Sequence, residues 1–112
     1  MDIQTTTQNG VKIVKLTGRL CMGAPLDRFN AAMSELLAQS HNRIVLDLEE
    51  MPTMDSSGIG MLVRYLASAK QSGGSVRLLK PSKFVFQTLK MVGLLNLFST
   101  YENLPEAIAS LQ

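Results

Sequence analysis

The sequence predicts an α/β fold, a single-domain sandwich in which about four helices cover a mixed, mostly parallel sheet. Short runs of β-branched and aliphatic residues alternate along the chain with segments whose apolar residues recur at helical spacing. The expected order of elements is β-β-α-β-α-β-α-β-α, without linkers or repeats. Because strands separated by helices connect through right-handed crossovers, we expect those strands to pair in parallel.

Residues 3–8 and 11–17 are expected to form a hairpin, because Asn9-Gly10 between them tolerates the positive φ angles of a two-residue turn. A helix should follow, since Pro25 suits a first helical turn. Its apolar residues at helical spacing are Leu26, Phe29, Met33, Leu36 and Leu37. The run over residues 44–48 is typical of a strand buried on both faces.

The rest of the chain is expected to alternate short strands with helices. A helix over residues 57–72 should stop at Gly73-Gly74, and a strand should follow over Val76–Leu79. Ser82 can cap a third helix, whose inward residues should be Val85, Phe86, Leu89 and Val92. A last strand is expected over Leu97–Ser99, before a helix that opens at Asn103 and Pro105.

The composition is that of an ordinary globular protein, with 112 residues, 46% apolar and 18% charged. The Lys and Arg residues are scattered and the net charge is +2, so no stripe for direct nucleic-acid binding is expected. No apolar run approaches the length that membrane insertion requires, and the first residues do not resemble a signal peptide. A single cysteine, Cys21, cannot form an internal disulfide. We therefore expect a cytoplasmic protein, and we expect neither cofactor nor metal.

The most informative segment lies between the strand at residues 44–48 and the next helix. Asp55, Ser56 and Ser57 stand at the helix start, where such side chains usually cap free N–H groups, for about 1 kcal/mol. The segment also leaves the carboxyl end of a strand, the edge at which α/β folds carry their sites. Gly58 and Gly60 would leave room there for another backbone. These residues are therefore compatible with two interpretations, helix capping alone and a functional site.

Phosphorylation of Ser56 would add a charge of about −1.5 to −2 beside the Asp55 carboxylate. The free N–H groups and dipole of the helix N-terminus would partly stabilise this charge, so the fold should persist. A partner docked there would meet repulsion and a desolvation cost. The expected result is a binding switch with little change of fold.

The helix that follows has two predicted faces. Steps of 100° place Ile59, Leu62, Val63 and Leu66 on the inward face. The residues expected to face water are Ser57, Met61, Arg64, Tyr65 and Ser68. An exposed Met–Tyr pair beside an arginine has the composition of a contact surface, although single exposed apolar residues are common.

At these residues the sequence resembles the STAS domain family, specifically its anti-sigma factor antagonists. The matching segments, in chain order, are Leu16–Leu20, Ile44–Leu48, Met54–Gly60, Arg64-Tyr65, Gly73-Gly74 and Met91–Leu94. The resemblance implies one STAS-like domain over residues 1–112 and a partner-switching role. An unmodified chain would bind an anti-sigma factor that is a serine kinase, which frees a sigma factor or another regulator. Phosphorylation at Ser56 would end binding, and a serine phosphatase would restore it.

The residues expected to contact the partner are Asp55, Ser57, Gly58, Gly60, Met61, Arg64 and Tyr65. ATP would be the substrate of the kinase and not a cofactor of this chain. The chain departs from the family at Cys21-Met22, where relatives often carry an aspartate near the phosphorylation loop. Loss of that carboxylate would alter kinase docking or reduce phosphorylation. The alternative is therefore a docking subunit of a membrane lipid-transport complex or a larger signalling assembly, without phosphorylation.

The residue pattern does not favour an enzyme. A nucleophilic Ser56 or Ser57 would need a base. The one histidine, His41, precedes the strand at residues 44–48, whereas the segment Met54–Gly60 that carries the serines (the serine loop) follows that strand. Five strand residues should hold the two groups about 15 Å apart. The Gly-x-Ser-x-Gly elbow of serine hydrolases is absent, and Gly58-Ile59-Gly60 lacks the third glycine of a dinucleotide site.

Overall fold

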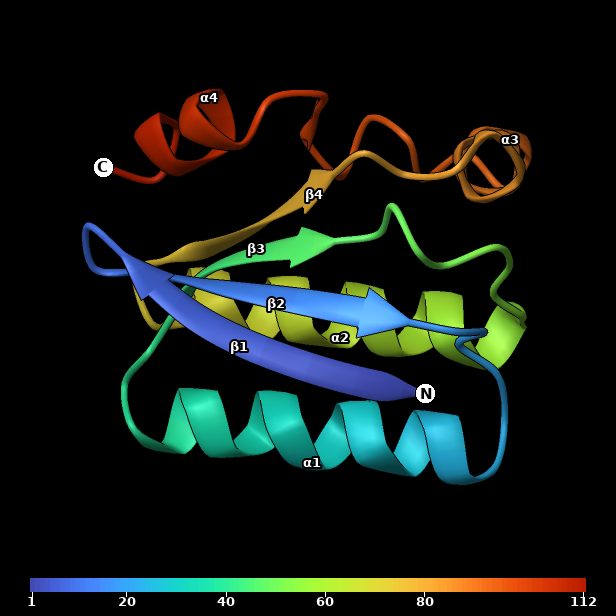
Figure 1. The fold of residues 1–112 in the computed structure, drawn as a ribbon, viewed down its shortest axis with the longest axis horizontal. Coiled ribbons are helices and arrows are strands. Elements are labelled where there is room, and N and C mark those ends of the chain that lie inside the picture. The colour runs from blue at the N-terminus through green and yellow to red at the C-terminus, as the bar shows by residue number, and fades with distance from the viewer.

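The computed structural model describes residues 1–112, and its elements follow the predicted order (Figure 1). The strands are β1 (Asp2–Gln8), β2 (Val11–Thr17), β3 (Arg43–Asp47), β4 (Ser75–Leu79) and β5 (Thr100–Tyr101). The helices are α1 (Ala24–Ala38), α2 (Ser56–Gln71), α3 (Lys83–Met91) and α4 (Leu104–Ala109). The strands lie side by side in the order β1-β2-β3-β4-β5. Only the β1–β2 pair is antiparallel, which confirms the mixed, mostly parallel sheet.

The β1–β2 hairpin follows from its turn residues. Asn9 and Gly10 have φ angles of 53° and 78°, as a two-residue hairpin turn requires. The register pairs Gln8 with Val11 directly across the turn. The predicted hairpin is therefore confirmed.

Strand alternation divides the core between the two faces of the sheet. Val14 and Leu16 of β2 belong to the larger core, which α1 and α2 cover. Val11 and Ile13 belong to the smaller core beneath α4. Figure 1 shows α1 and α2 on one side of the sheet and α4 on the other, with α3 beyond the end of β4. None of the four helices has the length and the hydrophobicity that spanning a bilayer would require.

Two predictions near the C-terminus were wrong in detail. The last strand is Thr100–Tyr101 and not Leu97–Ser99, because pairing with β4 begins only where the carbonyl of Ser99 accepts from the Leu78 amide. Val92, expected to point inward, is 53% exposed. It is the C-cap residue of α3 and lies beyond the last buried residue of the helix, Leu89.

The carboxyl ends of β2 and β3 meet where α2 begins. Leu20, just after β2, forms an isolated parallel bridge with Met54, just after β3. The amide of Leu20 donates to the carbonyl of Thr53, and the amide of Asp55 donates to the carbonyl of Leu20. These bonds fix the loop before α2 against the loop after β2.

Candidate functional site

Asp55 caps α2 and joins it to the neighbouring loop. One carboxylate oxygen, Oδ1, accepts from the amide of Gly58 at 2.9 Å, the usual geometry of an N-cap. The other oxygen, Oδ2, accepts from the amide of Met22 at 3.0 Å. A single side chain therefore satisfies a free N–H at the helix start and holds the loop after β2 in place.

The hydrogen bonds to Asp55 stabilise its charged form. The amides of Met22 and Gly58, in that order of effect, hold the pKa of this carboxyl below its usual range. Asp55 is therefore ionised at neutral pH. A permanent negative charge lies directly before Ser56 in the chain.

Ser56 is the first residue of α2, and its side chain is exposed. Its hydroxyl makes no hydrogen bond within the chain, because Asp55 already performs the capping. Ser57, the next residue, is half-buried and does not cap the helix either. The capping interpretation thus holds for Asp55 alone. Ser56 presents a free hydroxyl at the edge of the sheet.

The two glycines of the segment differ in their surroundings. A Cβ added to Gly58 would lie 2.7 Å from the carbonyl oxygen of Leu20, so the backbone that approaches this glycine belongs to the chain itself. The prediction that Gly58 leaves room for a partner was therefore wrong. Gly60 is exposed, and a Cβ there would have no atom within 4 Å. Space for a second molecule exists at Gly60.

Tyr65 does not face water as predicted. It is 5% exposed and packs edge-on against Phe29 of α1, with ring centroids 6.0 Å apart. Its hydroxyl donates to the main-chain carbonyl of Asn30 at 3.0 Å, lies close to the side-chain oxygen of Asn30, and shares a 2.6 Å hydrogen bond with Ser34. Tyr65 therefore joins α2 to α1, and it is not available to a partner.

The other outward residues of α2 are placed as follows. Arg64 is exposed, in agreement with the prediction. Met61 is half-buried and packs against the larger core, so only part of its side chain reaches the surface. The surface beside Ser56 is thus formed by Gly60, Arg64 and the exposed part of Met61.

Replacing Tyr65 with phenylalanine is expected to lower the free energy of unfolding by about 1 to 1.5 kcal/mol, because the oxygen atoms of Asn30 and Ser34 lose a shared partner. Chemical denaturation followed by circular dichroism measures the change. Tyr101→Phe is the matched control, since the Tyr101 hydroxyl makes no hydrogen bond in the structure. An equal loss in the two variants would contradict the described network.

The carboxylate of Asp55 should make stability depend on pH. Its pKa in the folded chain lies below the ordinary value, about 3.9, so the unfolded chain binds more protons as the pH falls through that range. The contribution of the carboxylate is therefore present above about pH 4 and is lost as the pH falls through the lowered pKa.

Urea unfolding between neutral pH and about pH 2.5 tests this. The stability difference between wild type and Asp55→Asn should shrink as the pH falls through the range in which the carboxylate is protonated. Asp2→Asn is the control, because the exposed Asp2 carboxylate accepts no hydrogen bond. A difference that stays constant with pH would mean that Asp55 acts only through its shape.

The family resemblance placed Cys21-Met22 near the phosphorylation loop, but the hydrogen bond from the Met22 amide to Asp55 was not predicted. Sequence patterns do reveal a cap, but no local signal identifies the Met22 amide as the second donor to Asp55. Cys21 is half-buried within this segment. The departure from the family pattern therefore lies immediately beside the serine loop.

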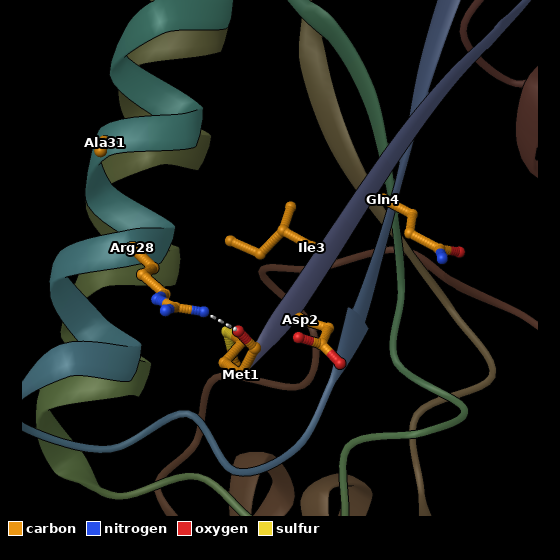
Figure 2. A pocket seen from close by; sticks show the side chains of 6 residues that line it. All are labelled: Met1, Asp2, Ile3, Gln4, Arg28 and Ala31. Atoms are coloured by element: carbon orange, nitrogen blue, oxygen red, sulfur yellow. Dashed lines mark hydrogen bonds between the residues drawn. The ribbon is translucent and has the colours of Figure 1, made fainter.

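Two further features lie away from the site. His41 precedes β3 at its amino end, whereas Ser56 follows the carboxyl end of that strand, as predicted. The largest cavity, about 530 Å³, lies between the first residues of β1 and α1. Figure 2 shows its lining and the hydrogen bond from Arg28 to the carbonyl of Met1. None of the serine-loop residues lines it.

The α/β sandwich, with Ser56 directly after the capping aspartate of α2, agrees with the fold that the resemblance to STAS domains implies. The model of the STAS domain family matches residues 2–107 of the chain. Because this match covers nearly the whole sequence, the protein belongs to the STAS domain family.

Known relatives agree with this assignment. The anti-sigma F factor antagonist of Paenibacillus polymyxa is 29% identical over 113 residues, which cover 100% of this chain and 96% of the relative. The solved structure of the Thermotoga maritima protein TM1081 has a TM-score of 0.90 at 24% identity, and covers 97% of this chain and 93% of that chain.

Two structures of the anti-sigma factor antagonist SpoIIAA, the second from Bacillus, show the same fold. The unphosphorylated form has a TM-score of 0.74 at 20% identity and covers 97% of this chain and 96% of that chain. The phosphorylated form has a TM-score of 0.75 at 22% identity and covers 97% of this chain and 98% of that chain. These likenesses confirm the predicted fold, and the sequence relatives include anti-sigma factor antagonists.

Proposed function

We propose that this chain is a phosphorylation-controlled protein-binding switch, an anti-sigma factor antagonist that acts as one domain over residues 1–112. The unmodified form binds an anti-sigma factor that is also a serine kinase, and thereby frees a sigma factor or another regulator. Phosphorylation of Ser56 ends that binding, and a serine phosphatase restores it. A cytoplasmic setting, where the kinase has access to ATP, belongs to this proposal.

The free hydroxyl of Ser56 carries the proposal. The residue is exposed at the first position of α2, and its oxygen has no partner within the chain. Modification would therefore break no hydrogen bond of the fold. Asp55 keeps the helix capped in either state, because its carboxylate is bound by the amides of Gly58 and Met22.

Phosphorylation would change the charge of the surface around Ser56 strongly. A phosphate brings about −1.5 to −2 beside the ionised Asp55, so the local charge approaches −3. The positive end of the α2 dipole offsets part of this charge within the folded chain. A partner that covers the site must instead desolvate the phosphate and meet its charge.

The contact surface would extend from Ser56 over the first turns of α2. Gly60 offers open space, Arg64 an exposed cation and Met61 a partly exposed thioether. Arginine and methionine are enriched in protein interfaces. Asp55, Ser57 and Gly58 would shape this surface by positioning Ser56, while Tyr65 remains inside the fold.

Incubation with a cognate kinase and ATP, followed by mass spectrometry, tests the proposal. We expect one phosphate, on Ser56. Ser56→Ala should remain unmodified, whereas Ser57→Ala should be modified as efficiently as the wild type. Labelling of Ser56→Ala at Ser57 would move the site by one residue, and no labelling of the wild type would contradict the switch.

A second function, docking without phosphorylation, is favoured by Cys21, because it lies in the segment that contacts Asp55. An aspartate at this position, which the resemblance to the family implies, would add a carboxylate near the serine loop. If Cys21→Asp is phosphorylated by the kinase and the wild type is not, the chain is a docking subunit that has lost the switch.

A further inference from the structure

A polar cavity of about 270 Å³ lies at the edge of the sheet opposite the serine loop. Arg43 begins β3 and is paired with Ser75, which begins β4. Ser110, directly after α4, lies on the other side of the cavity, and Arg77 projects from β4 between them. Only one of the residues that line the cavity, Leu111, is hydrophobic.

The guanidinium group of Arg77 is held in a fixed orientation by neutral partners. Its Nε donates to Ser110 Oγ at 3.0 Å, and one terminal nitrogen donates to Ser75 Oγ at 2.6 Å. The other terminal nitrogen donates to the main-chain carbonyl of Ser110 at 3.4 Å. Ser75 is only 8% exposed, and Arg77 itself is half-buried. These hydrogen bonds therefore fix the orientation of a partly desolvated guanidinium group.

No negative side chain balances the two arginines. None of the cavity residues is Asp or Glu, and the one ion pair of the structure joins Lys80 to Glu49 elsewhere. A half-buried charge without a counter-charge is unfavourable, and folded proteins usually pair such groups. Arg77 is therefore oriented and partly desolvated, and it has no acidic side chain as a partner. Three of its five N–H groups donate to Ser75 and Ser110, which leaves two for a ligand, and the exposed Arg43 adds a second positive charge at the same cavity.

We infer that this cavity binds the phosphate group of a small phosphate monoester. A guanidinium group presents several donors in a plane, which suits the oxygen atoms of a phosphate. Two such groups match a dianion better than a carboxylate, which has a single charge. The volume lies below the range of about 300–1,000 Å³ for drug-sized ligands, so the cavity would hold the phosphate and leave the rest of the molecule outside.

The inference does not depend on the switch at Ser56, because the cavity and the serine loop lie at opposite edges of the sheet. A Ser56→Ala variant should bind phosphate as the wild type does. Loss of phosphate binding and loss of phosphorylation are therefore separate results.

Titration of the isotope-labelled chain with inorganic phosphate, at constant ionic strength, tests the inference by NMR. We expect saturable shifts of the amide signals of Gly73, Gly74 and Ser110, with a dissociation constant in the millimolar range. Arg43→Gln should weaken binding at least tenfold, and it should fold normally because Arg43 is exposed. Arg19→Gln is the control: it removes the same charge from an exposed residue outside the cavity and should not change the affinity.

Phenyl phosphate and acetate serve as further probes. Phenyl phosphate should shift the same amides as inorganic phosphate, whereas acetate should bind at least tenfold more weakly. Phosphate should also raise the thermal midpoint of the wild type more than that of Arg43→Gln, since a ligand of the folded state stabilises it. Absent shifts at these amides, equal affinity for acetate, or equal affinity of Arg43→Gln and Arg19→Gln would each overturn the inference.

Discussion

Replacing Gly74 with alanine is expected to lower the free energy of unfolding by at least about 2 kcal/mol, the largest loss of stability that we predict. A Cβ at Gly74 would lie 2.6 Å from the main-chain carbonyl carbon of Asn42, closer than real side chains approach a backbone. The backbone segments at Gly74 and Asn42 cannot separate without breaking hydrogen bonds. Asn42 accepts from the amide of Ser75 at 3.0 Å, and its side chain donates to the carbonyl of Ser72 at 2.5 Å.

Gly60→Ala is the matched control, because it adds the same methyl group where no atom lies within 4 Å. This change should raise the stability by about 0.5 to 1 kcal/mol, since alanine favours a helix more than glycine does. Thermal unfolding by circular dichroism should show a midpoint lower by about 10 °C for Gly74→Ala and a slightly higher one for Gly60→Ala. A Gly74→Ala variant as stable as the wild type would contradict the close packing of Gly74 against Asn42.

The elements that the sequence predicted well are those with local signals. The hairpin was predicted from Asn9-Gly10, and the helix starts were predicted from residues such as Pro25 and Ser82. β5 has two residues and no pattern of its own, so its position depends on pairing with β4. A strand defined only by its neighbour cannot be placed from local sequence.

The candidate site likewise contains residues that local sequence predicted and residues that it did not. The segment from Asp55 to Gly60 was found because its residues are adjacent in the chain. Tyr65 was misplaced because a helical wheel assumes one buried face, whereas α2 packs against both the sheet and α1. The cavity with Arg43 and Arg77 gave no signal, since those residues meet Ser110 only through the tertiary fold.

Replacing Ser56 with aspartate is expected to weaken binding of the partner kinase at least tenfold, which corresponds to about 1.4 kcal/mol. The new carboxylate would lie beside the ionised Asp55 on the surface that a partner must cover. The fold should be nearly unaffected, because the Ser56 hydroxyl has no partner to lose and a negative charge is favourable at a helix N-terminus. Isothermal titration calorimetry with the purified partner measures the affinity, and thermal unfolding measures the fold.

Ser56→Asn separates charge from size, because asparagine has nearly the shape of aspartate without its charge. If repulsion controls binding, Ser56→Asn should retain most of the wild-type affinity, and the defect of Ser56→Asp should decrease as added salt screens the charge. Ser40→Asp, which adds the same charge to an exposed serine before the amino end of β3, should bind normally. Equal losses for Ser56→Asn and Ser56→Asp would show that the site rejects size, and the charge-based switch would have to be abandoned.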